Sequence, residues 1–180
     1  MFIGPMFSGK STELLRQVSR YKAIGKNVLV VNHTNDTRTD ESIKTHDNVK
    51  HMAVKVNSLL ILIKKYMLKD IDIIAIDEAQ FFPDLKEFIL KIERSNLILY
   101  MAGLDGDSNR NPFGQILECI PLCDSVVKLR ALDMINCDGH TKAPFSLRVK
   151  DTSDSQIQIG AKDFYKAVSR ENFLKAMDSQ

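Results

Sequence analysis

The sequence predicts an α/β fold in which helices flank a parallel sheet, and two observations carry that prediction. The first is the segment Gly4-Pro5-Met6-Phe7-Ser8-Gly9-Lys10-Ser11, which fits the phosphate-binding pattern G-x-x-x-x-G-K-[ST]. The second is the alternation of amphipathic helical patterns with short apolar runs over residues 14–129. Such alternation is typical of βαβ units, in which crossover helices connect parallel strands.

The phosphate-binding segment predicts a nucleotide site. Its glycines allow consecutive backbone N–H groups to point at an anion, and the helix that begins there directs its positive end at the same place. We expect Lys10 to reach the outer phosphates and the Ser11 hydroxyl to hold a magnesium ion. A glycine-rich turn before a helix is the alternative, but four fixed positions arise by chance in only about one chain in a hundred of this length.

The first elements follow directly from this segment. Residues 1–3 supply the strand that feeds it, so either that strand is very short or the true start lies upstream. A helix with its apolar face over 14–21 and a C-cap at Gly25 precedes a buried strand over 27–32. Residues 33–50 are polar and lack periodicity, and loops of that length usually have a function, so we expect a site loop there.

The remaining elements of the core alternate in the same way. They are a helix over 59–67 capped by Asn57 or Ser58, a strand over 71–76, a helix over 83–92, a strand over 97–102, a short apolar helix ending near 120 and a strand over 124–129. From Arg130 onward hydrophobicity decreases, and a last amphipathic segment covers 164–177. The sequence therefore predicts a nucleotide-binding core over 1–130 and a small appendage over 131–180.

Two acids end the apolar strand over 71–76. In P-loop proteins the acid at the end of such a strand supports the magnesium ion. A helix cap is the alternative interpretation, which the upstream phosphate-binding segment disfavours. Because Asp77 leaves the strand first, it is the predicted magnesium residue together with Ser11, and Glu78 is free for other chemistry.

Composition disfavours several classes of function. The 180 residues are 44% apolar and 27% charged, which is ordinary for a globular protein. A net charge of +2 gives no strong electrostatic case for a nucleic-acid or membrane partner. No apolar run approaches the roughly 20 residues of a membrane span. Three cysteines, an odd number, suit a reducing compartment, so we expect a cytoplasmic protein.

Several separate segments carry a specific family resemblance. The segment at 4–14 reads GPMFSGKSTEL, residues 35–38 read NDTR, and residues 45–47 read THD. Residues 77–84 read DEAQFFPD, against a family signature of D-E-[GA]-Q-F-F-P-D. The same order continues with Leu104-Asp105-Gly106, Pro112-Phe113-Gly114 and Val126-Val127-Lys128-Leu129. Over about residues 2–170 the chain thus resembles the cellular and poxviral (type II) thymidine kinases, most of all the short viral members.

That resemblance implies a P-loop (RecA-like) kinase core with a small C-terminal lasso subdomain, active as a homotetramer. It implies that the γ-phosphoryl group of ATP is transferred, with Mg²⁺, to the 5′-hydroxyl of thymidine or deoxyuridine. Phosphoryl transfer requires positioning and charge neutralisation, which Lys10, Ser11 and Asp77 would provide with the metal. The family pattern assigns two catalytic residues, Glu78 as the base and Arg38 as a group that stabilises phosphoryl charge.

The resemblance also predicts the residues that bind the nucleoside. An apolar slot with a few placed polar groups suits pyrimidine recognition, although core packing is an alternative role for Leu104 and Phe113. Ser108 stands where the family usually has phenylalanine, which would remove about 1–3 kcal/mol of apolar contact. The predicted substrate-binding set is Met6, Asp36, Gln80, Phe81, Leu104, Ser108, Phe113, Gln156, Ile157, Gln158, Ile159, Gly160 and Tyr165.

The small appendage departs from the family pattern. The family has a structural zinc held by two Cys-x-x-Cys-like pairs, but here the corresponding segments read DMINC at 133–137 and SREN at 169–172. Cys137 and His140 can supply two ligands, whereas tetrahedral structural zinc requires four. We therefore expect that the structural zinc is lost.

Two other functions stay open at this level. One is a degenerate P-loop module with a structural or regulatory role, which the missing zinc ligands, Ser108 and the short first strand would suit. The other is a P-loop ATPase acting on nucleic acid, which the absence of a basic stripe disfavours. The favoured hypothesis is an active deoxypyrimidine nucleoside kinase.

Overall fold

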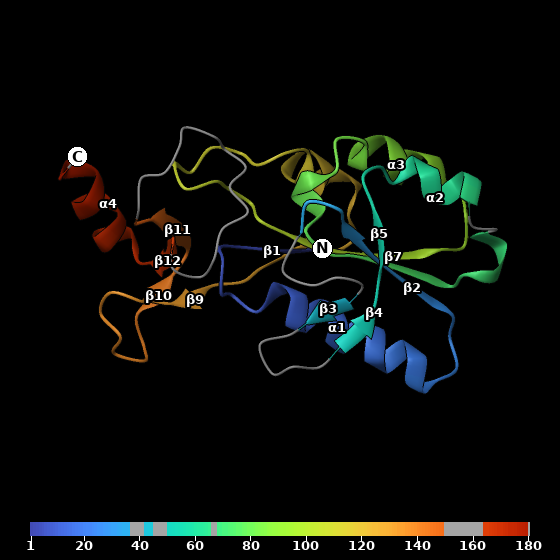
Figure 1. The fold of residues 1–180 in the computed structure, drawn as a ribbon, viewed down its shortest axis with the longest axis horizontal. Helices are drawn as coiled ribbons and strands as arrows, with labels where there is room; N and C mark the ends of the chain where they lie inside the picture. The colour runs from blue at the N-terminus through green and yellow to red at the C-terminus, as the bar shows by residue number, and fades with distance from the viewer. Residues whose placement is uncertain (37–41, 45–49, 66–67, 150–163, 180) are drawn as a thin grey trace.

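A sheet of six parallel strands forms the centre of the computed structural model, which describes residues 1–36, 42–44, 50–65, 68–149 and 164–179 (Figure 1). The strand order is β5-β2-β6-β7-β1-β8. The strands are β1 (Phe2–Ile3), β2 (Val28–His33), β5 (Val54–Val56), β6 (Ile73–Ile76), β7 (Ile98–Gly103) and β8 (Val127–Lys128). The predicted α/β fold with a parallel P-loop sheet is confirmed.

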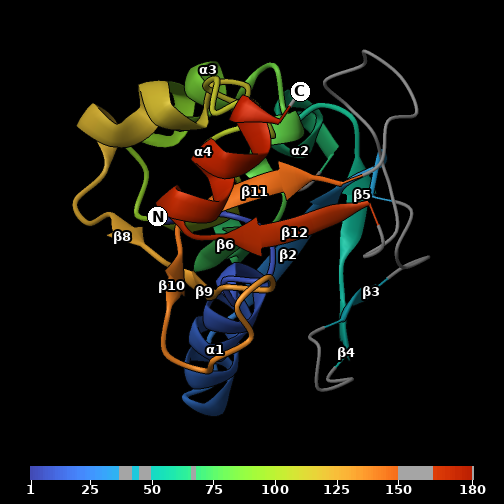
Figure 2. The same ribbon diagram turned by 90° about the vertical axis from the view of Figure 1, so that its left-hand side faces the viewer.

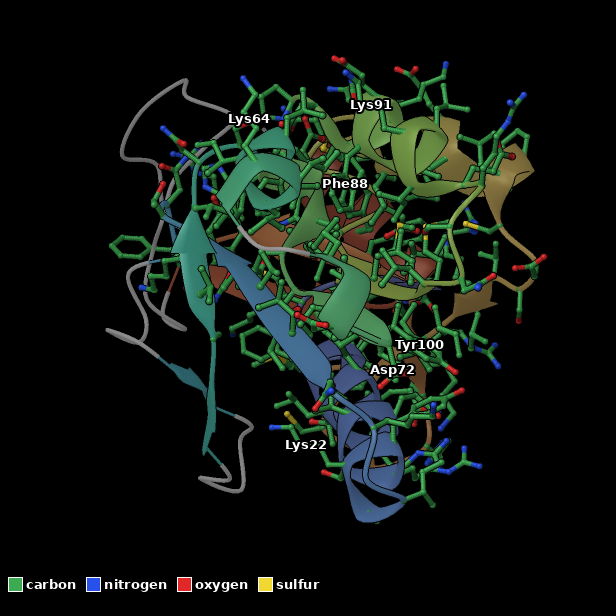
Figure 3. All side chains as sticks on the ribbon, turned by 90° about the vertical axis from the view of Figure 1, so that its right-hand side faces the viewer. Lys22, Lys64, Asp72, Phe88, Lys91 and Tyr100 are labelled. Carbon is green, nitrogen blue, oxygen red and sulfur yellow. The ribbon has the colours of Figure 1, made fainter. Side chains whose placement is uncertain are left out.

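Helices cover both faces of this sheet. Side chains alternate between the two faces along each strand, so the apolar strands present a hydrophobic surface on each face. Leu29 and Val31 of β2 face the side covered by α2 (Leu60–Lys65) and α3 (Leu85–Ile92), whereas Val30 faces α1 (Lys10–Ala23). Figure 3 shows Phe88 of α3 directed at the sheet and Lys91 of the same helix directed outward. In the described part of the chain, each helix is too short or too polar to span a bilayer.

Beyond β8 the chain forms what we call the small unit, residues 131–149 and 164–179. Its elements are β9 (Ala131–Leu132), β10 (Lys142–Ala143), β11 (Phe145–Arg148), β12 (Tyr165–Val168) and α4 (Arg170–Asp178). Strands β9 and β10 pair antiparallel, as do β11 and β12, and α4 lies beside β11 (Figure 2). The boundary predicted near residue 130 falls in the connection between β8 and β9.

The structure differs from the predicted elements in several places. The polar segment over 33–50 contains β3 (Ser42–Lys44), which pairs with β4 (Lys50–Met52). Strand β5 was not predicted, because three residues at the sheet edge give too short a pattern to recognise. The helix near 120 is a 3₁₀ segment, η3 (Ile116–Leu122). Residues 164–177 divide into β12 and α4, because the Ser169 side chain accepts a hydrogen bond from the Asn172 N–H and caps the helix.

The predicted cap of α2 is also wrong. The Leu60 N–H at the start of α2 donates to Asp84 Oδ2 at 3.0 Å, and the Ser58 hydroxyl donates to the same oxygen at 2.6 Å. Asp84 lies just before α3, so one carboxylate ties the beginnings of two helices together. A cap supplied from 24 residues away is invisible to a local pattern.

Candidate active site

The phosphate-binding segment forms a tight loop between β1 and α1. Gly4 has φ of 147°, and a Cβ there would lie 2.4 Å from the Leu129 carbonyl oxygen, so both conformation and space require glycine. Phe7 and Gly9 are left-handed, with φ of 63° and 81°. Left-handed residues within a turn direct successive N–H groups into one concavity, which is the geometry of an anion site. The positive φ values of Phe7 and Gly9 are of the kind found in such anion-binding turns.

Lys10 lies over this loop instead of extending into solvent. Its side chain is buried, and its Nζ donates to the Pro5 carbonyl oxygen at 2.6 Å. The Ser8 hydroxyl donates to the same carbonyl oxygen at 2.9 Å. The predicted phosphate-binding lysine is thus held beside the loop that would cradle the phosphates.

Other predicted residues lie at the carboxyl edge of the sheet, where the parallel strands end. Asp77 and Glu78 follow β6, Leu104 follows β7, and Asp36 follows β2, whose residue Val31 pairs with Ile76. Ligands of parallel α/β sheets bind at this edge. The carboxyl edge thus gathers side chains that are far apart in the sequence.

Both acids after β6 are buried at this edge. Asp77 is 3% exposed, and its N–H donates to the Val31 carbonyl oxygen at 2.9 Å, which continues the pairing with β2. Glu78 has φ of 52°, a left-handed conformation that is uncommon for a residue with a side chain. Such conformations cost about 1–3 kcal/mol and are concentrated at functional sites. Among the described residues other than glycine, Glu78, the predicted base, shares a positive φ with Phe7, Arg110 and Cys137.

Gln80 connects Glu78 to the end of β7. Its Nε2 donates to Glu78 Oε2 at 2.6 Å, and its Oε1 accepts the Leu104 N–H at 2.9 Å. Glycines leave room for it, since a Cβ at Gly103 would lie 2.5 Å from Gln80 Oε1 and one at Gly114 would lie 2.0 Å from its carbonyl oxygen. The family resemblance predicted Gln80 for the base pocket, and in the structure its amide also holds the Glu78 carboxylate.

Aromatic rings lie beside these polar groups. Phe81 and Phe113 pack edge to face with their centroids 5.5 Å apart, and Phe113 is buried. The His33 ring centroid lies 5.7 Å from that of Phe81 and 4.8 Å from that of Phe82. This contact was not predicted, because no motif surrounds His33. Burial lowers the pKa of His33. Through His33 and Phe81 these rings form one continuous aromatic cluster.

Asp36 is also held in place at this edge. It is 5% exposed, and one carboxylate oxygen accepts a hydrogen bond from Asn32 Nδ2 at 2.8 Å. Lys55 Nζ donates to the Asp36 carbonyl oxygen at 2.6 Å. Neither Asn32 nor Lys55 was predicted, because each acts through a partner that only the fold brings near.

The loop also touches the small unit. The Met6 N–H donates to Ser146 Oγ of β11 at 2.9 Å, and Phe7 packs against Ala131, Ala143 and Ala167. Next to this contact is an open hollow whose lining includes Pro5, Asp105, Arg110, Lys128 and Phe145. The small unit therefore closes over one side of the phosphate loop.

The other predicted residues fall on or near the small unit, or outside the described residues. Ser108 is half-buried in the loop after β7, and Tyr165 begins β12 opposite Arg148. Arg110, close to Ser108, has its guanidinium 4.5 Å from the Phe173 ring centroid of α4. The predicted residues outside the described part of the chain are Arg38, Gln156, Ile157, Gln158, Ile159 and Gly160.

The donor set at the edge fits magnesium. Mg²⁺ takes oxygen ligands and is usually held by one or two carboxylates together with substrate phosphates. Ser11 in the first turn of α1 offers a hydroxyl, and Asp77 offers a carboxylate. The described residues contain no group of three or more His, Cys, Asp or Glu that could hold a metal without a substrate.

This arrangement defines a P-loop nucleotide-binding protein. Comparison with known proteins narrows that class, because the family model for thymidine kinase matches residues 1–173. A thymidine kinase of Yaba monkey tumor virus (strain VR587) is 43% identical over 177 residues, which cover 97% of this chain and 93% of that protein. The thymidine kinase of Monkeypox virus is 39% identical over 174 residues, 97% and 95% of the two chains. The thymidine kinase of Myxoma virus (strain Uriarra) is 40% identical over 174 residues, 97% and 94% of the two chains. The chain belongs to the thymidine kinase family.

Proposed function

We propose that this protein is an ATP-dependent thymidine kinase. It transfers the γ-phosphoryl group of ATP to the 5′-hydroxyl of thymidine or deoxyuridine and releases ADP and the nucleoside monophosphate. The observation that carries the proposal is the pair Asp77 and Glu78 at the end of β6, in a chain whose phosphate loop follows β1. The family membership of the chain supports the same reaction.

The residues of the chain have distinct tasks in this reaction. Lys10 and the N–H groups of the loop neutralise the phosphates, where Ser11 and Asp77 would hold Mg²⁺. When bound, that ion supplies further positive charge against the phosphate oxygens. Glu78 accepts the proton of the 5′-hydroxyl as the oxygen attacks the γ-phosphorus. The Gln80 amide holds Oε2 of Glu78 at 2.6 Å, so the orientation of the base is set before the nucleoside arrives.

The nucleoside binds beside this base in the proposed reaction. The rings of Phe81 and Phe113 and the Leu104 side chain offer apolar contact for a pyrimidine, and the buried Asp36 lies at the same edge. Met6 of the phosphate loop and Tyr165 of β12 extend the pocket. Ser108 stands in place of the family's phenylalanine and so leaves the pocket wider. We assign Arg38 to the developing phosphoryl charge and residues 156–160 to the loop over the nucleoside, by the family pattern alone.

A panel of acceptors tests the proposed reaction. ADP release from Mg·ATP is measured with thymidine, deoxyuridine, deoxycytidine or single-stranded DNA, and product is identified by chromatography. We expect stimulation by thymidine and deoxyuridine and formation of the 5′-monophosphate. Folded protein that binds ATP but responds to no nucleoside would be a nucleotide-binding module. Stimulation by DNA alone would indicate a nucleic-acid ATPase.

We further propose a cytoplasmic homotetramer. Among the described strands β8 lies at one edge of the sheet, and it exposes Val127 with Val126 beside it, so this edge offers backbone groups and apolar side chains to a second copy. All three cysteines are free, as suits a reducing compartment. Light scattering at micromolar concentration tests the assembly, and Val127→Lys should lower the mass of the particle.

A further inference from the structure

The buried carboxylate of Asp133 is the centre of a polar cluster in the small unit. Asp133 follows β9 and is 3% exposed. Its Oδ1 accepts the N–H groups of Ile135 and Asn136 at 2.7 and 2.8 Å. Its Oδ2 accepts the Ser169 N–H and, at 3.0 Å, the Nδ2 of Asn172. Four donors thus serve the two oxygens, which is the full capacity of a carboxylate.

The same side chains also bind one another. Asn172 Nδ2 donates to Asn136 Oδ1 at 2.9 Å, and the Asn172 N–H donates to Ser169 Oγ at 3.3 Å. Asp133, Asn136, Ser169 and Asn172 therefore form one hydrogen-bonded group, which we call the Asp133 cluster. It joins two turns that are 36 residues apart in the sequence.

These two turns are the segments where the family resemblance implies structural zinc, and their side chains do not fit that metal. Zinc prefers thiolate and imidazole ligands, whereas the cluster offers a carboxylate, two amides and a hydroxyl that are engaged with each other. The nearby Cys137 is exposed, with its Sγ 3.4 Å from the Met134 carbonyl oxygen. The His140 side chain is 83% exposed and lies by Asp138.

We propose that the Asp133 cluster is a metal-free anchor that takes the place of the structural zinc and positions β12. The turn after β9 also makes two hydrogen bonds to β12. The Met134 N–H donates to the Ala167 carbonyl oxygen at 2.9 Å, and the Ala167 N–H points at the Met134 sulfur at 3.3 Å. Because β12 begins at Tyr165, Asp133 acts as a positioning residue for one side of the nucleoside pocket. This last step rests on the proposed function.

The charge state of Asp133 agrees with an anchor that works at neutral pH. Burial raises the pKa of Asp133, but hydrogen bonds from the Asn136 and Ser169 backbone and from the Ser169 and Asn172 side chains outweigh burial and hold the pKa well below its usual range. An aspartate in the unfolded chain has a pKa of about 4. The Asp133 carboxylate therefore stabilises the fold fully above that pH, and the stabilisation is lost as pH falls toward the pKa of the folded state.

Metal analysis and melting temperature (Tm) test the anchor without reference to activity. Protein produced with added zinc and then gel-filtered should contain less than about 0.1 zinc per chain, and chelator should leave its Tm unchanged. Asp133→Asn should lower Tm by about 5–10 °C, because it disrupts a buried charged network. Asp138→Asn is the matched control, since among the described residues that carboxylate accepts hydrogen bonds from Thr141 and His140 close by in the sequence, and it should change Tm by less than about 3 °C.

Kinetics then separate a positioning role from a merely structural one. For Asp133→Asn, assayed where circular dichroism shows it folded, we expect the KM for thymidine to rise about 5-fold or more and the KM for ATP to stay unchanged. If that variant does not fold, Asn172→Ala serves instead, because it removes two hydrogen bonds and keeps the carboxylate. It should change both readouts in the same direction by less.

Three results would overturn the proposal. They are one zinc per chain whose removal lowers Tm, equal Tm for Asp133→Asn and Asp138→Asn, and a loss of kcat alone with the thymidine KM unchanged. Inactive wild-type protein with the expected metal and Tm results would refute the kinase proposal and leave the anchor standing.

Discussion

The core sheet and the small unit are held together by different kinds of contact. On both faces of the sheet, large apolar side chains such as Phe82, Phe88 and Leu14 are completely buried. Among the described residues of the small unit, one apolar cluster has only alanines as its buried members, with Phe7 and Met134 partly buried against them, and another is centred on Phe173. Alanine buries little apolar area, so the small unit has less hydrophobic stabilisation to draw on.

This difference shows where polar contacts matter most. In the core, several buried polar groups gather at the carboxyl edge, where they would serve the proposed reaction. In the small unit, the Asp133 cluster connects the turns that hydrophobic contacts alone join weakly. We therefore expect polar substitutions to impair activity in the core and stability in the small unit.

The largest expected effect is on catalysis at the carboxyl edge. Glu78→Gln should lower kcat by about 10²–10⁴-fold, because an amide cannot accept the proton of the 5′-hydroxyl. ATP binding, measured by calorimetry, should persist. Asp72→Asn is the control, since Asp72 (labelled in Figure 3) precedes β6, at the end of that strand away from Glu78, and pairs with Lys26 on the surface. Equal kcat in the two variants would refute the assignment of Glu78.

Removing an apolar side chain should show that the core depends on hydrophobic burial. Phe88→Ala should lower the free energy of unfolding by about 3–5 kcal/mol, since the ring is fully buried between α3 and the sheet. Leu90→Ala on the same helix should cost less than about 1 kcal/mol, because Leu90 is 48% exposed. Denaturant unfolding measures both, and similar losses would contradict the division between core and surface.

A smaller effect should follow from releasing the Glu78 carboxylate. Gln80→Met keeps the length of the side chain and removes its hydrogen bonds to Glu78 and Leu104. We expect kcat to fall about 10-fold, since the base is then less well oriented. Gln17→Met is the control, because Gln17 is a buried glutamine of α1 whose amide donates a hydrogen bond to Glu13 and not to Glu78. An unchanged kcat in Gln80→Met would mean that Glu78 is oriented by other contacts.

The smallest effect is a dependence of core stability on pH through His33. Burial lowers its pKa in the folded state, and its Nδ1 accepts the Asn35 N–H at 3.0 Å, which suits the neutral ring. The unfolded chain therefore takes up the proton first, so stability falls as pH drops below about 6.5. The decrease in Tm between pH 7.5 and 5.5 should be smaller in His33→Gln than in the wild type. Identical decreases would exclude His33 as a contributor.

Much of the fold and part of the site followed from the sequence. The phosphate loop, the strand ending in Asp77 and Glu78, and helix α3 are contiguous segments, so spacing and local chemistry were enough to recognise them. The parallel sheet followed because apolar strands alternate with amphipathic helices. Strand β5 and the pair β3–β4 were not predicted, because such short strands depend on partners elsewhere in the chain.

The tertiary structure alone decided how distant polar groups meet. The link from Gln80 to Leu104 and the capping of α2 by Asp84 each join residues that are 24 positions apart in the sequence. The left-handed backbone of Glu78 is a conformation that no sequence motif specifies. The sequence predicted that the structural zinc of the family is lost, and only the fold revealed that Asp133 and Asn172 meet in that place. Local chemistry determines which groups are available, and chain closure determines which of them become partners.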